Sequence, residues 1–406
     1  MSSGPDRVHD VLIVGGGLVG ASLAIALEPL GLDVAMLEAT PAGELPPVFD
    51  QRNLSFAEAT VNALQALGVM PLLQTAGAPI RRIHVSRAGG FGRLLLDAAE
   101  HGRAAFGRVV VARDFGQALE ARLQQLRTLT RHRPARFLAL EDAGDGLRRV
   151  RIESADGEQV LATRLLVAAD GARSQVRAAL GIEADVHDYR QTLFVARIRS
   201  DRAPDGQAFE RLTGDGPTAL LPRADGHYGL VHAVPAQEAE AVAALGDAAF
   251  LARVQAAFGW RAGRFSAVGP RSAYPIMGSV ARRLVARRAV LVGNAAQALH
   301  PLGAQGFNLG LRDALTLAEC IAGAPDPGAA EVLARHASRR GEDRQRTLQF
   351  SDGLARLTAS DAPLLGPLRS LGFAALQSSD WLRAWLVGGA MGYRGDVPEL
   401  CRERAA

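Results

Sequence analysis

The sequence predicts an α/β protein: a nucleotide-binding domain built on a parallel sheet, an inserted domain built on an antiparallel sheet, and a helical C-terminus. Two observations favour this fold class. A strand, a glycine-rich turn, a helix and a second strand follow one another within residues 11–38. Apolar segments bounded by turns then recur between residues 191 and 234, as antiparallel strands do.

The N-terminal unit begins with residues 11–14, VLIV, a continuous apolar run typical of a strand buried on both faces. The turn GGGLVG at residues 15–20 leads into a helix expected over residues 21–27. A second strand over residues 32–37 ends at Glu38. This order of elements is that of a Rossmann-like dinucleotide site.

Four residues of this unit have predicted roles in binding a dinucleotide. Gly15 permits the tight turn, Gly17 lets the backbone approach a pyrophosphate, and Gly20 lets the helix pack closely on the strand. The helix N-terminus offers N–H groups to the phosphates. Glu38 can accept hydrogen bonds from both ribose hydroxyls of an adenosine and would repel a 2′-phosphate. The unit therefore predicts FAD or NAD as the ligand.

Two later segments repeat the pattern of a strand followed by a turn and a helix. The first, LLVAADGARSQVR at residues 165–177, has an Asp170-Gly171 turn, and Ser174 is expected to cap the helix after it. The second has a buried strand that ends at Gly293, followed by a loop of small residues through Pro301. This loop leads to a glycine-rich helix start, whose N–H groups could stabilise negative charge on a reduced flavin ring.

Together these segments resemble the FAD-dependent aromatic hydroxylases of the para-hydroxybenzoate hydroxylase fold. Residues 170–177 are similar to that family's DGxxSxxR motif, and residues 293–301 to its GDAAHxxxP motif. Asn294 and Gln297 stand where the family usually has Asp and His. With the following GAQGFNLGLRD, this segment is similar to the ubiquinone-biosynthesis branch that acts on 2-polyprenyl-6-methoxyphenol.

Local matches to this branch extend over the whole chain. DQRNLS at residues 50–55 is similar to the DxRxxALS segment of the branch, which implies that Arg52 lies near the flavin. Arg113 stands where the family has an arginine close to FAD. Residues 209–222 are similar to the ERF…GPxALLP strand pair of the substrate domain, and residues 391–395 to the C-terminal ending.

The resemblance implies a Rossmann-like FAD-binding domain with an inserted antiparallel-sheet substrate domain and a helical C-terminus. We expect the FAD-binding domain at residues 1–75, 100–180 and 275–350, and the substrate domain at 76–99 and 181–274. Residues 351–406 are expected to form the C-terminal helical segment, and the alanine-rich residues 236–258 are expected to be helical.

The resemblance also implies an FAD-dependent monooxygenase that hydroxylates the ring of a polyprenylated phenol in ubiquinone biosynthesis, with NAD(P)H as reductant and O2 as co-substrate. The expected cofactor-binding residues are Gly15, Gly17, Gly20, Glu38, Arg52, Arg113, Asp170, Gly171, Gly293, Asn294, Pro301, Gly306, Phe307 and Asn308. The substrate pocket is expected to be walled by Leu220, Leu221, Pro222 and Val231, each of which also fits a sheet core.

No catalytic acid or base is assigned, because a phenol is already activated by its own hydroxyl. His300 is the nearest titratable candidate in the sequence, and a structural hydrogen bond in the loop is the interpretation we favour for it. The C-terminal segment mixes Trp381 and Trp385 with Arg383 and Arg394. This mixture fits contact with an anionic membrane surface, a packed helix or a protein partner.

Composition excludes several other functions. The chain has no lysine, so pyridoxal-phosphate chemistry and lysine-containing phosphate loops are ruled out, as is a flavin halogenase that relies on lysine. The net charge is only +4, and we expect neither a nucleic-acid partner nor a metal site. Cys320 and Cys401 are far apart and are expected to be reduced thiols of a cytoplasmic protein, and peripheral contact with the inner face of the membrane is compatible with this expectation.

Three alternatives stay open. The chain could hydroxylate another small aromatic compound. It could be a flavin reductase or dehydrogenase that does not insert oxygen. It could also be a non-catalytic flavoprotein scaffold in a multi-enzyme biosynthetic complex, since Asn294 and Gln297 depart from the flavin motif.

Overall fold

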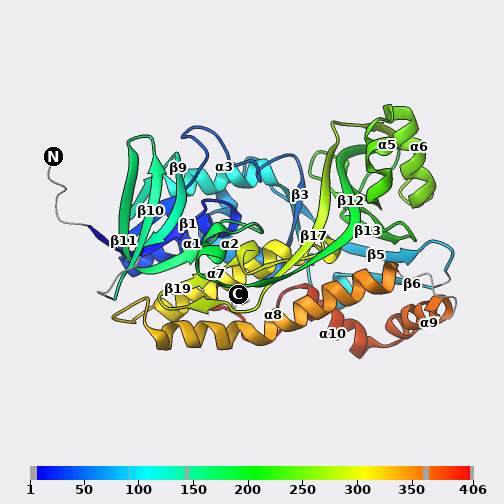
Figure 1. Cartoon of the computed structure of the whole chain (residues 1–406). Helices are drawn as coiled ribbons and strands as arrows, with labels where there is room; N and C mark the ends of the chain where they lie inside the picture. The colour runs from blue at the N-terminus through cyan, green and yellow to red at the C-terminus, as the bar shows by residue number, and fades with distance from the viewer. Residues whose placement is uncertain (1–6, 91, 142–145, 360–364, 403–406) are drawn as a thin grey trace.

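The computed structural model describes residues 7–90, 92–141, 146–359 and 365–402. It contains two large sheets that lie side by side (Figure 1). Within the first sheet a parallel part follows the spatial order β19 (Ala289–Leu291), β11 (Gly157–Ala168), β1 (Val8–Val14), β2 (Val34–Leu37) and β8 (Leu129–His132). Three further strands join it antiparallel: β18 (Val285–Ala286), β10 (Arg148–Ser154) and β9 (Ala135–Glu141).

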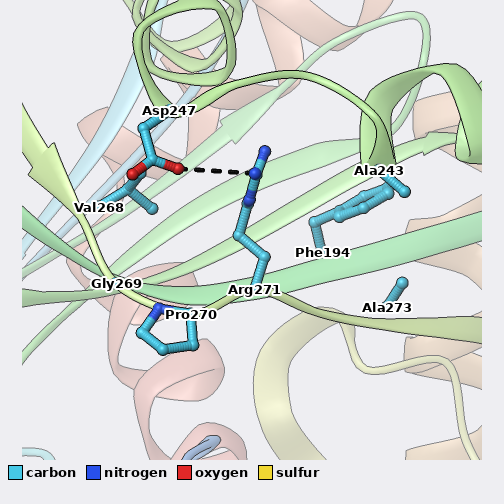
Figure 2. A pocket seen from close by; sticks show the side chains of 8 residues that line it. All are labelled: Phe194, Ala243, Asp247, Val268, Gly269, Pro270, Arg271 and Ala273. Carbon is cyan, nitrogen blue, oxygen red and sulfur yellow. Dashed lines mark ion pairs between the residues drawn. The ribbon is translucent and has the colours of Figure 1, made fainter.

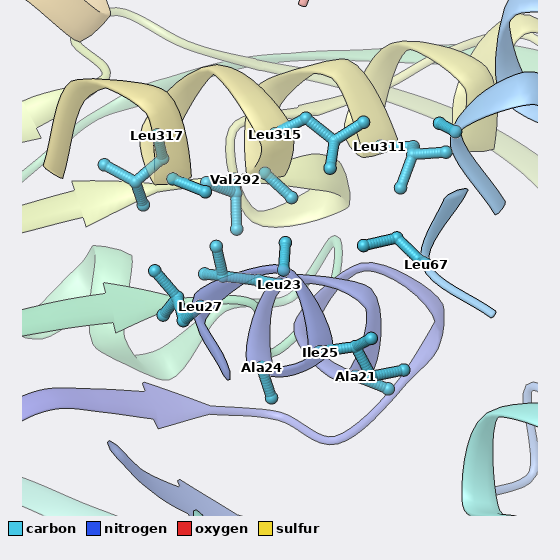
Figure 3. Close-up of a cluster of buried hydrophobic side chains, with 14 of the residues drawn as sticks. Ala21, Leu23, Ala24, Ile25, Leu27, Leu67, Val292, Leu311, Leu315 and Leu317 are labelled. Carbon is cyan, nitrogen blue, oxygen red and sulfur yellow. The ribbon is translucent and has the colours of Figure 1, made fainter. Parts of the chain in front are cut away.

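The parallel strands are continuous apolar runs because helices cover them. All four residues of β2 are buried, and so are the last four of β1. Helix α1 (Leu18–Leu27) is apolar all round and is buried from Gly20 onward. It packs against α7 (Gln305–Ile321) through Leu23 and Leu27, which meet Leu311 and Leu315 in one cluster (Figure 3). Full burial of each leucine contributes about 1.5–3 kcal/mol.

The second sheet has nine strands. Its spatial order is β20 (Gln297–Ala298), β17 (Ser272–Ala281), β12 (Ala184–Ser200), β15 (Tyr228–Pro235), β14 (Pro217–Pro222), β13 (Gln207–Leu212), β5 (Arg82–Arg87) and β6 (Arg93–Asp97), with β16 (Phe265–Val268) beside β12. All pairs are antiparallel except β13 with β5. The predicted fold class is therefore confirmed, including the antiparallel strands between residues 191 and 234.

The two faces of the second sheet have different neighbours. We call one face the outer face; it carries Phe209, Leu220 and Leu230, which pack under α6 (Asp247–Phe258). The opposite face, which carries Ala208, Leu221 and Val231, is the inner face. The outer face is covered by α5 (Ala239–Ala243) and α6 (Figure 1). A single helix was expected over residues 236–258, but it is broken after Ala243, and α6 starts anew after Gly246.

The inner face is covered by other parts of the chain. A small sheet of β3 (Asn53–Ala57), β7 (Gly107–Val111) and β4 (Ala78–Pro79) packs there through Val109 against Ala208 and Leu221. Helix α8 (Ala330–Ala359) runs along the bottom of Figure 1 toward α9 (Leu365–Ser378) and α10 (Asp380–Ala390), which lie below β6. The domain boundary expected at residue 275 lies inside β17, a strand of the second sheet.

The remaining elements are short. The other helices are α2 (Glu58–Ala66), α3 (Ala112–Leu123) and α4 (Gln175–Ala179). The 3-10 turns are η1 (Glu28–Leu30), η2 (Met70–Leu72), η3 (Ala99–His101), η4 (Ala236–Glu238), η5 (Gly293–Ala295), η6 (Leu302–Ala304) and η7 (Glu399–Cys401).

Candidate functional site

The segments singled out in the sequence meet at one edge of the first sheet. Strands β19, β11, β1 and β2 are parallel neighbours, so their carboxyl ends lie at the same edge. Gly15 and Glu38 follow the ends of β1 and β2 directly, and Asp170 and Gly293 lie two residues beyond the ends of β11 and β19. Ligands of open α/β sheets bind outside the carboxyl ends of the strands. The sheet order therefore makes one site out of four turns that are far apart in the chain.

Gly15 and Gly20 are required by the backbone alone. Gly15 has a φ of +106°, and a Cβ atom there would lie 2.5 Å from the carbonyl oxygen of Ala169. A Cβ atom on Gly20 would lie 1.9 Å from the carbonyl oxygen of Gly15. These two glycines let the turn and the first turn of α1 sit directly against the neighbouring strand.

Gly17 differs, because the space in front of it is open. It is the N-cap of α1, no side chain caps the helix there, and a Cβ atom would meet only a Val48 methyl at 3.9 Å. A ten-residue helix that begins at such a glycine presents its first N–H groups and the positive end of its dipole outward. This geometry fits a pyrophosphate.

Glu38 faces the glycine turn from the end of β2. Its carboxylate accepts hydrogen bonds from the N–H groups of Gly16 at 3.0 Å and Thr40 at 2.7 Å. These bonds hold the carboxylate beside the turn, where it is only partly buried. It retains lone pairs that can accept hydrogen bonds from a ribose.

The Asp170 turn is held together by its own side chains. Asp170 accepts hydrogen bonds from the Ser174 hydroxyl at 2.5 Å and the Val176 N–H at 3.1 Å. Ser174 caps α4 by accepting from the Arg177 N–H at 2.9 Å, as predicted. Arg177 then donates to the carbonyl of Ala295 at 2.9 Å, so this turn is tied to the one at Gly293. This link through Arg177 was not predicted from the sequence.

The turn after β19 touches the start of α1. Gly293 has a φ of +59°, and a Cβ atom on it would lie 2.8 Å from a methyl of Val19. Gly310 approaches the same methyl, since a Cβ atom there would also lie 2.8 Å away. Gly171 has a φ of +87°, and a Cβ atom on it would have nothing within 4 Å. The segment expected near the adenosine and the one expected near the flavin ring are thus in contact.

The two departures from the family pattern have different surroundings. Asn294 is exposed at the site, where its amide oxygen can accept a hydrogen bond. Gln297 is buried and points into the protein: it donates to Asp313 at 2.6 Å and accepts from Arg344 at 2.8 Å. The glutamine therefore joins two charged residues and gives no reason to expect a weakened cofactor site.

A buried ion network lies beyond Gln297. Arg340 donates to Asp313 at 2.8 Å and to Asp343 at 2.6 Å, and Arg312 donates to Asp343 at 2.7 Å. Burial opposes charge on Asp343, but Arg312 and Arg340 outweigh it and lower the pKa of Asp343 to about 2. The network fixes α7 to α8 behind the site.

The loop before α7 has an unusual backbone. Gly303 and Ala304 both have positive φ, +74° and +51°. Pro301 is exposed, and a Cβ atom on Gly306 would have open space around it. Phe307 packs its ring against Phe56 at 5.4 Å. The loop thus presents backbone and small residues outward, as expected for a segment that lies along a flat ring.

Asn308 holds this loop to β3 and α2. Its side-chain oxygen accepts from the Ala57 N–H at 3.0 Å and the Thr60 hydroxyl at 2.7 Å, and its amide donates to the carbonyls of Ser55 and Ala304. Each polar atom of the side chain is engaged inside the protein. We therefore expect Asn308 to act on a cofactor only by positioning the loop.

His300 is a structural residue of the loop. It is buried, its Nδ1 accepts from the Leu302 N–H at 3.1 Å, and its ring packs edge-on to Tyr189 at 4.7 Å. Burial lowers the pKa of His300 to about 4. The imidazole is therefore neutral near pH 7 and has no proton to give as an imidazolium acid.

The two arginines carried over from the resemblance are placed differently. Arg52 pairs with Asp50 at 2.8 Å and lies over the ring of Tyr274, whose hydroxyl donates to the same carboxylate. This contact joins the 50–53 loop to β17. Arg113 is exposed at the start of α3, which is tied to the loop by its N–H bond to the carbonyl of Asp50 at 2.9 Å. Its guanidinium has no ion pair with any described residue and remains available to a phosphate.

The expected substrate wall needs a correction. Side chains alternate along a strand, so Leu220 and Pro222 lie on the outer face and Leu221 lies on the inner face. Leu220 is fully buried with Phe209 and Phe250 under α6, in the core and not in a pocket wall. Val231 lies opposite Ala219, on the same inner face as Leu221. Only Leu221 and Val231 face the side of the flavin segments.

A cavity of about 520 Å³ lies on the outer side instead (Figure 2). It is lined by Phe194 and Ala273 of the sheet and by Ala243 and Asp247 of the helices. Arg271 crosses it and forms an ion pair with Asp247 at 3.5 Å. Because the second sheet separates it from the glycine turns, this cavity is not the dinucleotide site.

Comparisons with known proteins agree with this geometry. A family model described as FAD binding domain matches residues 8–351. The ubiquinone hydroxylase UbiL of Rhodospirillum rubrum is 36% identical over 392 residues, covering 95% of this chain and 90% of the relative. The 3-demethoxyubiquinol 3-hydroxylase of Escherichia coli is 29% identical, with 94% and 98% covered.

A solved structure shows the same fold. The p-nitrophenol 4-monooxygenase PnpA of Pseudomonas putida DLL-E4 has a TM-score of 0.78, over 96% of this chain and 99% of the other, at 17% identity.

Proposed function

The chain belongs to the FAD-dependent aromatic hydroxylases of ubiquinone biosynthesis, and from this premise we propose that it hydroxylates the ring of a polyprenylated phenol. One observation of the structure carries the proposal: four turns converge at the sheet edge, next to the apolar inner face of a second sheet. The first feature fits FAD, and the second fits a lipophilic aromatic compound.

The residues present fit FAD. The open N-terminus of α1 at Gly17 suits the pyrophosphate, Glu38 suits the ribose, and the exposed guanidinium of Arg113 suits a phosphate. We assign the cofactor site to Gly15, Gly17, Gly20, Glu38, Arg52, Arg113, Asp170, Gly171, Gly293, Asn294, Pro301, Gly306, Phe307 and Asn308. Among them Gly15, Gly20, Asp170 and Asn308 act by shaping the turns.

Bound FAD supplies the redox chemistry, taking electrons from NAD(P)H and activating O2 for transfer to the ring. The protein holds the ring and keeps water away. The loop from Pro301 to Gly306 is partly exposed at the site, and Leu221 and Val231 contribute apolar side chains on the inner face. Exclusion of water strengthens every polar interaction inside such a cleft.

The proposal predicts oxygen transfer from O2. The purified chain, loaded with FAD and given NADH or NADPH under labelled O2, should convert 2-prenyl-6-methoxyphenol to a product that carries one labelled oxygen. Labelled water is the control and should leave the product unlabelled. The proposal would be contradicted if NADH or NADPH were consumed but the phenol were not hydroxylated, or if the hydroxylated product carried no label.

We also propose that the C-terminal helices contact the membrane in which such a substrate is dissolved. Trp381 is 70% exposed, Trp385 51% and Leu371 57%. The guanidinium of Arg394 lies 3.6 Å from the ring centre of Trp385, which places positive charge within this surface. Tryptophan beside arginine is typical of helices that lie in the interface of an anionic bilayer.

The other side of the same helices leads to the inner face. Leu376, Leu386 and Val387 pack in one cluster with Ile83 and Val85 of β5. The helices that carry the tryptophans therefore also contact the inner face. Within the part of the chain that the structure describes, no helix has both the length and the apolarity to cross a bilayer.

The double variant Trp381→Ser/Trp385→Ser tests this contact. We expect it to bind vesicles containing anionic lipid at least about tenfold more weakly than the natural sequence, because two interfacial anchors are lost. Trp260→Ser is a matched control, since Trp260 is 66% exposed but lies beyond α6. Equal sedimentation of all three proteins with vesicles would instead assign the surface to a protein of a biosynthetic complex.

A further inference from the structure

One carboxylate on the inner face of the second sheet is Glu210. Glu210 is in β13, between Val85 of β5 and Ala219 of β14. Its neighbours in sequence, Phe209 and Arg211, point to the outer face, where Phe209 packs under α6 and Arg211 donates to Ser86. Alternation therefore directs Glu210 to the side of the flavin segments.

The neighbours of Glu210 in its row across the sheet are apolar. They run from Val85 on one side, and from Ala219 through Val231 to Val195 on the other. Val231 packs in a cluster with Leu193 and Tyr189. Tyr189 in turn contacts His300, directly before the loop expected along the flavin ring. Glu210 thus belongs to the surface that leads to this loop.

Glu210 is unpaired: among the residues that the structure describes, none forms a hydrogen bond or an ion pair with it. Burial alone raises the pKa of Glu210 to about 7, and yet part of its surface remains accessible. The carboxyl is therefore shielded from most of the solvent but can still be reached. An unpaired carboxyl in such a place is a candidate for binding a polar group of a ligand.

The charged groups around this face do not account for the shift. On the neighbouring strands and on the segments packed over the inner face they are Arg87, Arg223, Arg108, Arg103, Glu58 and Tyr393. Arg223 pairs with Asp225, and Arg103 with Glu58. Tyr393 donates to Glu58, and Arg108 donates to the carbonyl of Gly77. No charge on any of them is among the causes of the Glu210 shift.

We propose that Glu210 binds the hydroxyl of the phenol substrate and accepts its proton during hydroxylation. This role rests on the proposed function. The O–H bond of the phenol breaks, the proton goes to a carboxylate oxygen of Glu210, and the electron pair stays on the phenolate oxygen. The phenolate raises electron density at the ring carbons that receive oxygen. The proton returns to solvent from the carboxyl after the product leaves.

The chemistry fits the group. An ordinary glutamate has a pKa of about 4.3 and a phenol about 10. A base is most effective when its pKa lies near the working pH. Desolvation moves Glu210 toward that value, since a carboxylate in an apolar cleft holds a proton more tightly.

The test is the pH profile of kcat and KM for 2-prenyl-6-methoxyphenol, with labelled product counted. The natural sequence should lose activity as pH falls through about 7, because protonated Glu210 cannot accept a proton. Glu210→Gln can still hydrogen-bond the phenol, so KM should change less than about threefold, while kcat should fall roughly 100-fold and lose this acid limb. Glu210→Asp should restore the limb in part.

Controls separate the possible outcomes. Glu158→Gln removes an exposed carboxylate of β11 and should match the natural sequence. Flavin content and the unfolding temperature show whether Glu210→Gln is folded. If Glu210→Gln is not folded, the natural sequence alone decides: activity that does not fall as pH drops through about 7 overturns the role of Glu210. If Glu210→Gln gives labelled product with the same pH dependence of kcat as the natural sequence, the role of Glu210 is also overturned. If the natural sequence gives no labelled product, the proposed function is overturned, and the role of Glu210 with it.

Discussion

Gly20→Ala is expected to produce a protein that binds FAD roughly 100-fold more weakly and is destabilised by about 3 kcal/mol. The added Cβ atom would lie 1.9 Å from the carbonyl oxygen of Gly15 and 3.2 Å from the Cβ of Ala169. Both neighbours belong to the turns that form the site, and backbone cannot move aside as a flexible side chain can. Flavin fluorescence during titration with FAD measures the first effect, and denaturant unfolding measures the second.

Gly341→Ala is the matched control. This glycine is also in a helix, α8, but a Cβ atom on it would have nothing within 4 Å. Alanine there should stabilise the helix by about 0.5–1 kcal/mol and leave FAD binding unchanged. If Gly20→Ala bound FAD as well as Gly341→Ala, the assigned contact between α1 and the Gly15 turn would be wrong.

Asp343→Asn is expected to lower the free energy of unfolding by about 3–5 kcal/mol. The substitution removes the negative charge between Arg312 and Arg340, which are both almost fully buried. Arg312 would then lose the carboxylate with which it pairs, whereas Arg340 would keep Asp313. Because α7 carries both Arg312 and the glycine-rich start of the cofactor loop, flavin binding should weaken as well.

The pH dependence of the same variant gives a second readout. The pKa of Asp343 is about 2 in the folded protein, below the value of about 3.9 in an unfolded chain. The stability that the charged form contributes is therefore complete above about pH 4 and is lost as pH falls toward 2. Asp343→Asn should lack this part of the acid sensitivity.

Glu342→Gln serves as the comparison on the same helix. Glu342 pairs with Arg346, but both side chains are more than half exposed. Loss of an exposed pair one turn apart costs only about 0.3–0.5 kcal/mol. A similar small cost for Asp343→Asn would contradict the view that the buried network holds α7 and α8 together.

Much of the cofactor domain could be predicted because its signals are local. The strand at residues 11–14, the glycine turn and the acid at Glu38 lie within one stretch of chain, and each has its own reason in backbone geometry. The helix cap at Ser174 was predictable for the same reason, because a cap depends only on the residues that directly follow the capping side chain. The break after Ala243 was missed because alanine-rich sequence favours helix on both sides of it.

The roles of individual side chains were harder to predict. Gln297 seemed to bear on flavin binding, but it faces Asp313 and Arg344 inside the protein. Leu220 seemed to wall the substrate pocket, but it belongs to the core under α6. Glu210 could have been noticed as a carboxylate among apolar residues, but the sequence does not show which elements cover each face of the second sheet.

The sequence by itself determined which turns must contain glycine, where the first two strands end, and that the chain has an α/β fold with an inserted antiparallel sheet. These properties depend on steric limits and apolar periodicity over a few neighbouring residues. Only the tertiary structure decided which side chains meet: the link from Arg177 to Ala295, the burial of Asp343, and the position of Glu210 on the inner face. Such contacts depend on strand order and on which helix covers each face, and both are set by burial of the whole core.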